Sequence, residues 1–362
     1  MKVFINTSPL SSGHRFRGVG YYTQNLLKAL QMVDRKNTYL TRAEDFDRAD
    51  VLHVPFFSPF AKSLPWRKRA KLVVTIHDLI PLLFPDHYPP GAKGKIAYKI
   101  QKFLIQKAEA VITDSQASKK DIIRFLNLPA QKIKVIYLAP GDIFSPITNH
   151  RSLVTAREKY HLPKRFILYV GDINYNKNIP ALVTACEQID FPLVIVGKQA
   201  ANLEIDPDHP ENQDLVWLQK KLAAGRQPLV TDLRSLATEH KSPVIALGFV
   251  PSKDLPVIYS LATVYCQPSL SEGFGLPVLE AMACGCPVVA SRTSSLPEVC
   301  GSAALLVAPK ADKLARALLK VSQNQQLQKL LKNNGLVQAG KFSWIKTAQE
   351  TCQVYESVYS KN

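Results

Sequence analysis

Short apolar runs rich in β-branched residues alternate along the chain with segments long enough for one helix each. In the first part of the chain these runs are 3–5, 51–54, 72–76, 110–113 and 134–137, and in the second part they are 166–170, 193–196, 244–247, 264–267 and 287–290. Alternation of this kind predicts parallel strands joined by crossover helices. Because the pattern occurs twice, we expect an α/β protein with two doubly wound, Rossmann-like domains.

The segment 146–163 separates the two halves. It contains no strong strand signal and it begins and ends with a proline, Pro146 and Pro163. Such a segment is typical of an interdomain linker, here with room for one short helix. The expected domains are therefore residues 1–145 and a second domain that begins at residue 164.

Charge and cysteine content restrict the function further. The net charge is +17, and residues 1–150 carry 23 Lys and Arg against 11 Asp and Glu. This basic first half could meet nucleic acid, anionic lipid or a phosphorylated acceptor, but without a helix-turn-helix, zinc-finger or RNA-binding signature we expect no nucleic-acid partner. The six cysteines follow no metal or disulfide spacing, so we expect them reduced.

The chain shows neither a membrane span nor a signal peptide. No stretch approaches the roughly 18 to 20 uncharged apolar residues that a spanning helix needs. The opening MKVFINTSPL lacks the basic, apolar and small-residue sections of a secretory signal. We therefore expect a cytoplasmic protein.

The strongest chemical signal is the segment PSLSEGFGLPVLEAMACG at 268–285. Two glycines, Gly273 and Gly275, follow an expected strand, and Pro277 and Gly285 suit the first turn and the C-terminal cap of a helix. A helix N-terminus that follows a glycine loop favours an anion such as a diphosphate. Glu272 and Glu280 would repel a phosphate, but a carboxylate can accept hydrogen bonds from neighbouring sugar and ribose hydroxyls.

This segment resembles family 4 glycosyltransferases of the GT-B fold, whose hallmark is two glutamates separated by seven residues. Glu272 and Glu280 match it within SEGFGLPVLEAMACGCPVVAS. The resemblance implies a nucleotide-sugar donor bound between two Rossmann-like domains, with Glu272 on the transferred sugar and Glu280 on the nucleotide ribose. It also implies backbone N–H donors to the sugar and diphosphate from the loop and helix start, at Gly273, Phe274, Gly275 and Leu276.

The segment YVGDINYNKN at 169–178 is a second match. A strand ends in Gly171, and Lys177 in the following loop would neutralise the charge that builds on the departing diphosphate. The family usually places an arginine directly after this glycine, whereas this chain has Asp172. Either another cation replaces that arginine, or the donor binds with a different geometry.

Two further segments match in the first half. Gly18 and Gly20 form an expected glycine loop that would approach the donor and acceptor, flanked by Arg15 and Arg17 as candidate ligands for an acceptor phosphate. His77, in VVTIHDLIP, follows a strand where α/β sheets place ligands, and the resemblance puts such a histidine beside the sugar and acceptor. Its neighbour Asp78 is expected to orient the loop.

The resemblance extends to the segment 247–261 and to the C-terminal residues. It implies that the second domain covers 164–343 and that a final helix at 344–362 returns to the N-terminal domain. The implied reaction is transfer with retention of the anomeric configuration, without a metal or a separate cofactor. Charge on the phosphate would be stabilised by Lys177 and the backbone amides of 273–276.

The N-terminal and HDLIP segments look most like the mannosyltransferase-like branch, which suggests GDP-mannose as donor, with UDP-sugars as the alternative. The expected acceptor is a saccharide or a lipid-linked acceptor in cell-surface polysaccharide or glycolipid synthesis. A separate hypothesis is peripheral contact with an anionic membrane. It rests on a basic and aromatic patch at 66–69 and on a lysine-rich helix expected at 94–107.

Three other functions remain as alternatives. A metal-dependent transferase would use an Asp-x-Asp pair, and two exist, at 45–47 and 206–208, both in polar surroundings. A glycoside hydrolase would need two carboxylates flanking the scissile bond. A non-catalytic nucleotide-sugar-binding protein is suggested by Asp172 in place of the usual arginine.

Overall fold

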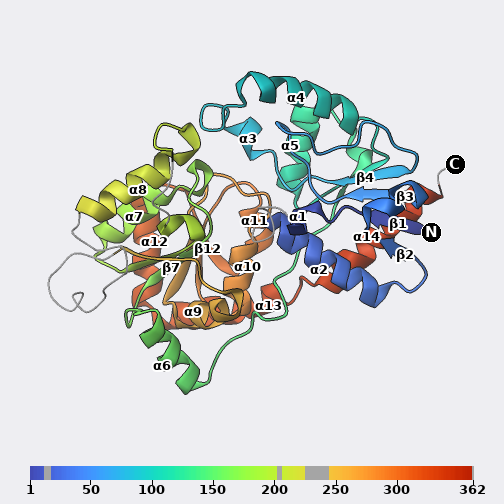
Figure 1. Ribbon diagram of the computed structural model, residues 1–362. Coiled ribbons are helices and arrows are strands. Elements are labelled where there is room, and N and C mark those ends of the chain that lie inside the picture. The colour runs from blue at the N-terminus through green and yellow to red at the C-terminus, as the bar shows by residue number, and fades with distance from the viewer. Residues whose placement is uncertain (12–17, 202–205, 225–243, 361–362) are drawn as a thin grey trace. The chain divides into compact units, whose positions relative to one another are not determined.

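The computed structural model describes residues 1–11, 18–201, 206–224 and 244–360 (Figure 1). The described residues form two compact units. Unit 1 contains residues 1–139 together with 342–362, and unit 2 contains residues 140–341. The C-terminal segment therefore belongs to the same unit as the first half of the chain.

Unit 1 contains a six-stranded parallel sheet in the order β2-β1-β3-β4-β5-β6. Its strands are β1 (Lys2–Ile5), β2 (Thr38–Leu40), β3 (Val51–Val54), β4 (Lys71–Thr75), β5 (Ala110–Thr113) and β6 (Ile133–Val135). Its helices are α1 (Ser8–Ser11), α2 (Gly18–Val33), α3 (Ile80–Leu83), α4 (Gly91–Ile105), α5 (Gln116–Leu126) and α14 (Trp344–Tyr359). Alternate residues of each strand serve the two faces of such a sheet, so helices must cover both.

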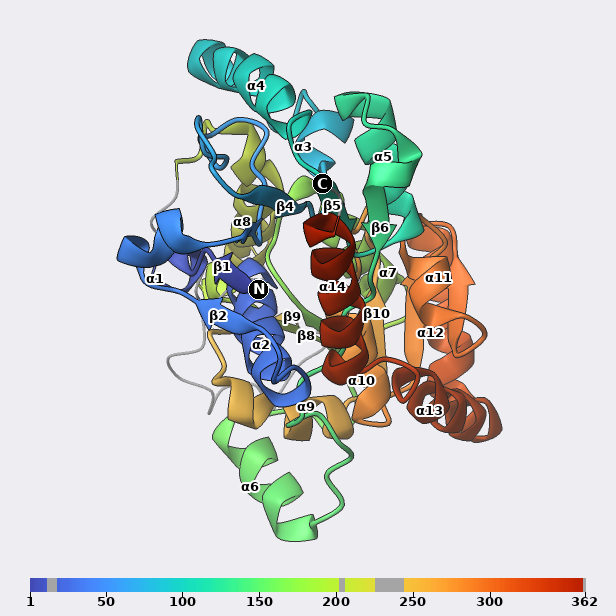
Figure 2. The same ribbon diagram turned by 90° about the vertical axis from the view of Figure 1, so that its right-hand side faces the viewer.

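One face of this sheet packs against α4 and α5 through an apolar cluster that includes Leu72, Val74, Leu104 and Ile122. On the other face α14 lies beside α2 and contacts β3, β4 and β5 (Figures 1 and 2). A chain of buried hydrogen bonds fastens α14 there: Tyr355 to His53 Nδ1 at 2.6 Å, and His53 Nε2 to the Thr75 hydroxyl at 2.8 Å. Burial lowers the pKa of His53 to about 3, which keeps this ring neutral.

Unit 2 contains a second six-stranded parallel sheet, in the order β12-β11-β10-β7-β8-β9. Its strands are β7 (Ile167–Val170), β8 (Leu193–Val196), β9 (Val244–Gly248), β10 (Val264–Gln267), β11 (Val288–Ser291) and β12 (Ala304–Val307). Its helices are α6 (His150–Lys159), α7 (Ile179–Gln188), α8 (Gln213–Ala224), α9 (Leu255–Leu261), α10 (Leu276–Ala283), α11 (Leu296–Cys300), α12 (Ala311–Gln323) and α13 (Gln325–Ala339). The chain forms β7, β8 and β9 in one direction across the sheet, and then returns to form β10, β11 and β12 on the other side of β7. The strand order therefore reverses between β7 and β10.

All ten strands expected from the sequence are present, each within two residues of its predicted ends. The sequence missed β2 and β12. Each of them is the outermost strand of its sheet. β2 is a three-residue strand, TYL, whose residues are exposed or half-buried, so it gives a weak hydrophobic signal. β12, with the sequence ALLV, is half-buried but apolar throughout, so its run was available in the sequence.

The segment 146–163, predicted as a linker, packs on unit 2. It does contain a short helix, α6, but Tyr160 at its end donates a hydrogen bond to Asp254 at 2.5 Å, and the Ile147 amide donates to Ser260 at 3.0 Å. Just before it, the Phe144 ring lies edge-on to Tyr259. Side-chain contacts of this kind, which the proline content does not reveal, place the boundary between units at 139–140.

All six cysteines are buried and free of disulfides, as the sequence predicted. Among the described residues, none of the helices has both the length and the apolar character needed to cross a membrane.

Candidate functional site

The loops that follow β7 and β10 meet at the point of unit 2 where the strand order reverses. In α/β sheets this position, at the carboxyl ends of the strands, is where ligands bind. Side-chain amides join the two loops: Asn176 Nδ2 donates to the Ser271 carbonyl and Asn178 Nδ2 donates to the Pro268 carbonyl, both at 3.0 Å. The backbone adds a bond from the Leu270 amide to the Asn176 carbonyl at 2.7 Å. Residues 95 positions apart are thereby held in one polar cluster.

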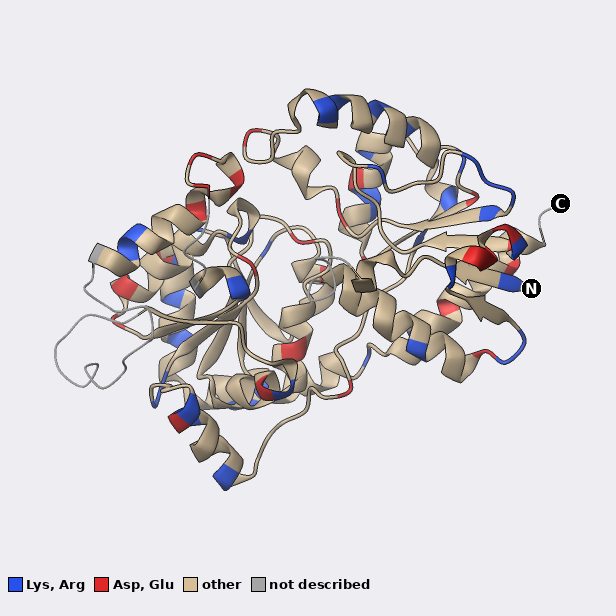
Figure 3. Cartoon of the chain, viewed as in Figure 1, with Lys and Arg blue, Asp and Glu red and all other residues tan. Residues whose placement is uncertain are grey.

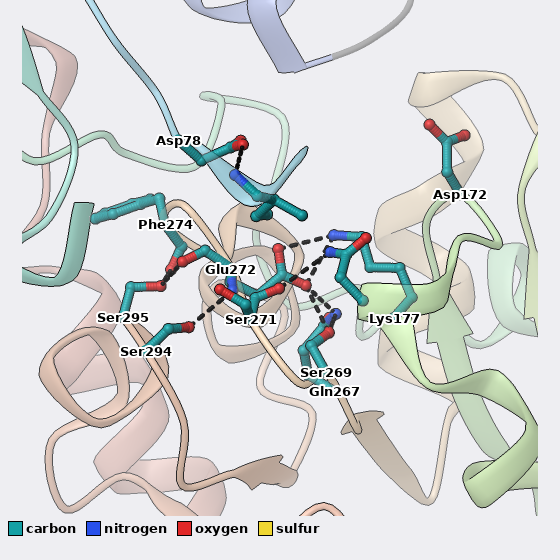
Figure 4. A network of polar contacts seen from close by, with 12 residues as sticks. Asp78, Asp172, Lys177, Gln267, Ser269, Ser271, Glu272, Phe274, Ser294 and Ser295 are labelled. Atoms are coloured by element: carbon teal, nitrogen blue, oxygen red, sulfur yellow. Dashed lines mark hydrogen bonds and ion pairs between the residues drawn. The ribbon is translucent and has the colours of Figure 1, made fainter. Parts of the chain in front are cut away.

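The Glu272 carboxylate is the centre of this cluster (Figure 4). Lys177 Nζ lies 2.8 and 2.7 Å from its two oxygens. Gln267 Nε2 and the Ser269 hydroxyl donate to Oε1 at 2.8 and 2.6 Å. The side chain of Glu272 is only 7% exposed, whereas that of Lys177 is 21% exposed. A carboxylate this deeply buried needs the cation and both hydrogen bonds, and they fix its direction.

The loop after β11 holds the backbone around Glu272. The Ser294 hydroxyl accepts from the Glu272 amide at 2.7 Å, and the Thr293 hydroxyl donates to the Ser269 carbonyl at 2.7 Å. The Ser295 hydroxyl lies within hydrogen-bond distance of the Glu272 and Phe274 carbonyls. Three consecutive hydroxyl residues therefore set the course of the loop that leads into α10.

Helix α10 begins at Leu276, directly after Gly275. Gly275 has φ +101°, a conformation that L side chains rarely adopt, and a Cβ there would lie 2.9 Å from Leu296 Cδ2. Pro277 occupies the first turn, and Gly285 follows the helix with φ +70°. Both ends of the helix therefore have the caps that the sequence predicted. Pro277 has no N–H, and the Val278 amide donates to the Gly275 carbonyl at 3.0 Å, so the start of α10 contributes mainly the positive end of the helix dipole.

Glu280 lies one turn inside α10, where the Tyr259 hydroxyl of α9 donates to its Oε2 at 3.0 Å. Burial raises the pKa of Glu280 to about 7, although the hydrogen bond from Tyr259 lowers it. This carboxyl group therefore changes its charge near neutral pH. Carboxyl groups with a pKa raised in this way are found often at functional sites.

Asp172 lies apart from the Glu272 cluster in Figure 4, and its carbonyl accepts from the Tyr169 hydroxyl at 2.7 Å. Asp172 follows Gly171, at the end of β7. The Gly171 carbonyl oxygen lies so close to Gly197 that a Cβ at residue 197 would come within 2.2 Å of it. The fold therefore brings Lys177, which the sequence singled out, into contact with Glu272. Asp172, which stands where the family usually has an arginine, lies apart from Glu272.

In unit 1, His77 links the ends of three strands. Its Nδ1 lies 2.6 Å from Asp114 Oδ2 after β5, and its Nε2 lies 3.1 Å from the Pro55 carbonyl after β3. Because a carbonyl only accepts, Nε2 carries a proton. Burial by itself lowers the pKa of His77, but the Asp114 carboxylate raises it above its ordinary value. Both ring nitrogens therefore have partners within the protein, and His77 holds the strand ends together.

Gly18 and Gly20 do not form the loop that the sequence predicted. They are in the first turn of α2, which begins at Gly18, because a helix N-terminus tolerates glycine before the apolar face begins. Arg15 and Arg17 lie outside the described residues. Asp78 accepts from the Ile80 amide at 3.0 Å and so supports the start of α3, in agreement with its expected orienting role.

A cavity of about 430 Å³ lies on the α4 side of the unit 1 sheet. Its lining includes Phe4 and Leu52, on the two strands between which the strand order of this sheet reverses. The connections from β2 to β3 and from β3 to β4 contain a short 3-10 helix and an extended loop in place of α-helices, so this part of the sheet is covered incompletely. The other lining residues are Asn6, Ser8, Ala43, Phe46, Val54, Phe56, Lys62, Ser63, Leu64 and Pro65.

The sequence reasoning missed the residues that hold the candidate site together. These are Asp114, Asn176, Asn178, Tyr259, Gln267, Ser269 and the hydroxyl residues 293–295. The two asparagines that flank Lys177 carried a usable signal, because Asn in a βα loop caps backbone groups. Gln267 and Ser269 lie only five and three residues before their partner Glu272, within the segment that the sequence singled out. The partners of Asp114, Tyr259 and the hydroxyl residues 293–295 lie more than 20 residues away, so no local pattern reveals them.

Comparison with known proteins identifies families for both halves of the chain. The family described as "Glycosyl transferases group 1" matches residues 155–337, and "Glycosyltransferase Family 4" matches residues 4–139. O-antigen chain mannosyltransferase B of Escherichia coli is 31% identical over 297 residues, which cover 79% of this chain and 70% of that protein. Serotype-specific mannosyltransferase WbdA of Escherichia coli is 30% identical over 299 residues, 80% of this chain but only 33% of that protein.

Among solved structures, Anabaena HepE in complex with UDP-glucose superposes with a TM-score of 0.74 at 18% identity. The match covers 99% of this chain and 100% of that one. At this identity the likeness concerns the fold, which is the GT-B fold of two parallel-sheet units.

Proposed function

This chain belongs to the family 4 glycosyltransferases, and from that membership we propose that it transfers mannose from GDP-mannose, with retention of configuration and without a metal, to a saccharide or lipid-linked acceptor. The observation that carries the proposal is the Lys177–Glu272 cluster at the start of α10. UDP-sugars are the alternative donors. The mannosyl specificity is supported by relatives named as mannosyltransferases.

We place the donor diphosphate at the N-terminus of α10, where the helix dipole and the backbone amides around 273–276 favour negative charge. The Glu272 carboxylate then accepts hydrogen bonds from hydroxyls of the transferred sugar. Glu280, one turn further along the helix, accepts from the ribose hydroxyls in its ionised form. Gly171 and Asp172 border this donor site from the end of β7.

Donor binding changes the partner of Lys177. In the structure its ammonium group is paired with Glu272 at 2.7 Å. The side chain is 21% exposed and its four-carbon stem is flexible, so the ammonium can turn from the carboxylate to the diphosphate while Gln267 and Ser269 keep their bonds to Glu272.

The chemistry then needs no separate general base. The bond between the sugar C1 and the diphosphate oxygen breaks, and the electron pair goes to that oxygen, where Lys177 and the α10 amides stabilise the charge. The acceptor hydroxyl attacks C1 from the face that the diphosphate leaves, which retains the configuration. Its proton passes to the departing phosphate oxygen, so atoms and charge balance.

On unit 1 we assign the acceptor to the carboxyl edge of the sheet. His77 is held there by Asp114 and Pro55, and a Cβ at Gly18, the first residue of α2, would have nothing within 4 Å. The cavity beside Phe4 and Leu52 is lined mainly by apolar side chains. It suits an acceptor with an apolar portion better than a wholly hydrophilic one.

The proposal is tested by incubating the protein with GDP- and UDP-sugars, with EDTA present, and following diphosphate release and the anomeric configuration of the product. We expect release from GDP-mannose in the presence of acceptor, retention at C1, and no loss of rate with EDTA. Inactivation by EDTA would favour the Asp-x-Asp alternative. Tight donor binding without turnover would favour a non-catalytic protein, and an inverted product would overturn the proposed chemistry.

A further inference from the structure

The outer surface of unit 1 around α4 is unusually basic. The segments 58–69 and 91–107 carry nine Lys and Arg and no Asp or Glu. In Figure 3 the helix α4 shows blue positions and no red ones. On a protein with 29 acidic residues, two adjoining segments without any acidic residue form a distinct cationic surface. We call these two segments the α4 surface.

The two segments are fastened to each other. Buried Gln101 of α4 accepts from the Ser63 hydroxyl at 2.9 Å and from the Leu64 amide at 3.2 Å. Further along, Lys68 Nζ donates to the Lys107 carbonyl at 2.7 Å and pairs with Glu109. These four contacts hold the loop along α4 and the turn that follows it, so the residues between Leu64 and Lys68 have a fixed place beside the C-terminal half of α4.

Large apolar side chains project from this cationic surface. Ile96, Phe103 and Trp66 are 61, 59 and 60% exposed. Ile96 and Phe103 are seven residues apart and therefore lie on one stripe of the helix, with Lys99 between them. Lys107 Nζ lies 4.6 Å from the centre of the Phe103 ring. Exposing aromatic and branched side chains to water is unfavourable, and here it occurs where the cations are densest.

From this combination we propose that the α4 surface docks unit 1 on an anionic lipid bilayer. The lysines and arginines other than Lys68, which is paired with Glu109, would meet the phosphate headgroups, and Trp66, Ile96 and Phe103 would insert at the boundary of the acyl chains. Nucleic acid shares the phosphate chemistry but offers no apolar layer for Ile96 and Phe103, so the bilayer fits the surface better. The docking rests on unit 1 alone; only the idea that the membrane supplies a lipid-linked acceptor rests on the proposed function.

The test is co-sedimentation of the full chain with vesicles of phosphatidylcholine mixed with phosphatidylglycerol, compared with pure phosphatidylcholine. We expect binding to the anionic vesicles only, weakened by salt. Lys95→Glu with Lys99→Glu should lower the partition coefficient at least about tenfold, since two cations that would face the anionic surface become anions. Ile96→Ser with Phe103→Ser should also weaken binding while leaving the salt dependence in place.

A matched control exists on unit 2, where Lys329 and the 55% exposed Leu330 lie side by side on α13. Lys329→Glu with Leu330→Ser should leave vesicle binding unchanged. A second readout is the tryptophan emission, which should shift to the blue on anionic vesicles in the wild type and not in Trp66→Phe.

Three outcomes would overturn the docking proposal: equal binding to uncharged vesicles, an equal loss in the α13 control, or oligonucleotide binding that the Lys95 and Lys99 changes abolish without affecting vesicle binding. Donor turnover measured without vesicles reports on the transferase site independently. An active enzyme that ignores vesicles would therefore refute the docking and leave the proposed function intact.

Discussion

Replacing Lys177 by alanine is expected to lower the rate of sugar transfer by about 10²- to 10³-fold, because the departing diphosphate loses its cation. Lys177→Arg should retain part of the activity, since it keeps the charge in a bulkier, planar group. Steady-state rates with GDP-mannose measure both effects. Lys164→Ala, which removes an exposed lysine from the same unit, serves as the matched control and should be without effect.

The same substitution also disturbs the fold, and a second variant separates the two effects. The Glu272 carboxylate, 7% exposed in the structure, loses its cation in Lys177→Ala, which should cost about 3 to 5 kcal/mol of stability. Adding Glu272→Gln removes the unpaired charge, so the double variant should recover most of the lost thermal stability, which assigns that loss to the buried carboxylate. The rate of transfer by Lys177→Ala, measured well below its unfolding temperature, reports on catalysis separately, and a wild-type rate there would leave Lys177 with only a structural role.

Replacing Glu280 by glutamine is expected to have opposite effects on the free and the donor-bound protein. The folded protein holds the Glu280 proton more tightly than the unfolded chain, because burial raises its pKa from 4.5 to about 7. The stability that this carboxyl group contributes is therefore fully present below pH 4.5 and is lost as the pH rises through 7. Glu280→Gln should then raise the unfolding temperature of the free protein at pH 8 by several degrees and change it much less at pH 5.

Donor binding reverses the stability advantage of Glu280→Gln over the wild type. Ribose hydroxyls are held best by an ionised carboxylate that accepts from both of them, so Glu280→Gln should weaken donor binding by about 1 to 3 kcal/mol. Thermal unfolding with and without GDP-mannose measures both effects in one experiment. Glu158→Gln is the matched control, because it removes an exposed carboxylate from the same unit. This variant should change neither the unfolding temperature nor the affinity for the donor. A Glu280→Gln variant that is stabilised yet binds donor as well as the wild type would place the ribose elsewhere.

Local patterns predicted most of the fold. The inner strands are continuous apolar runs of β-branched residues, and the glycine and proline positions around α10 have clear conformational reasons, so both could be located from the sequence. The edge strand β2 could not, because three exposed or half-buried residues give a weak hydrophobic signal, whereas the apolar run ALLV of β12 was available in the sequence and was overlooked. The interdomain boundary was displaced because Tyr160 and Phe144 attach their segment to unit 2 through distant partners.

The candidate site was predictable only in part, for the same physical reason. Glu272, Glu280 and Lys177 lie in motifs that resemble a known family, but their surroundings come from other strands. The pairing of Lys177 with Glu272 joins residues that are 95 positions apart in the sequence. Asp114 and His77, which contact each other, are 37 positions apart. The raised pKa of Glu280 depends on burial between α10 and α9, which no local pattern expresses.

The central claim is that a nucleotide-sugar donor binds at the start of α10 with Glu280 ionised, and calorimetric titration of GDP-mannose across neutral pH tests it most directly. The diphosphate of this donor does not titrate in that range, because the sugar occupies its terminal phosphate. The account predicts that the affinity of the wild type rises about tenfold between pH 6 and pH 8, and that Glu280→Gln binds weakly with no such rise. Binding that is independent of pH and equal in the two proteins would contradict it.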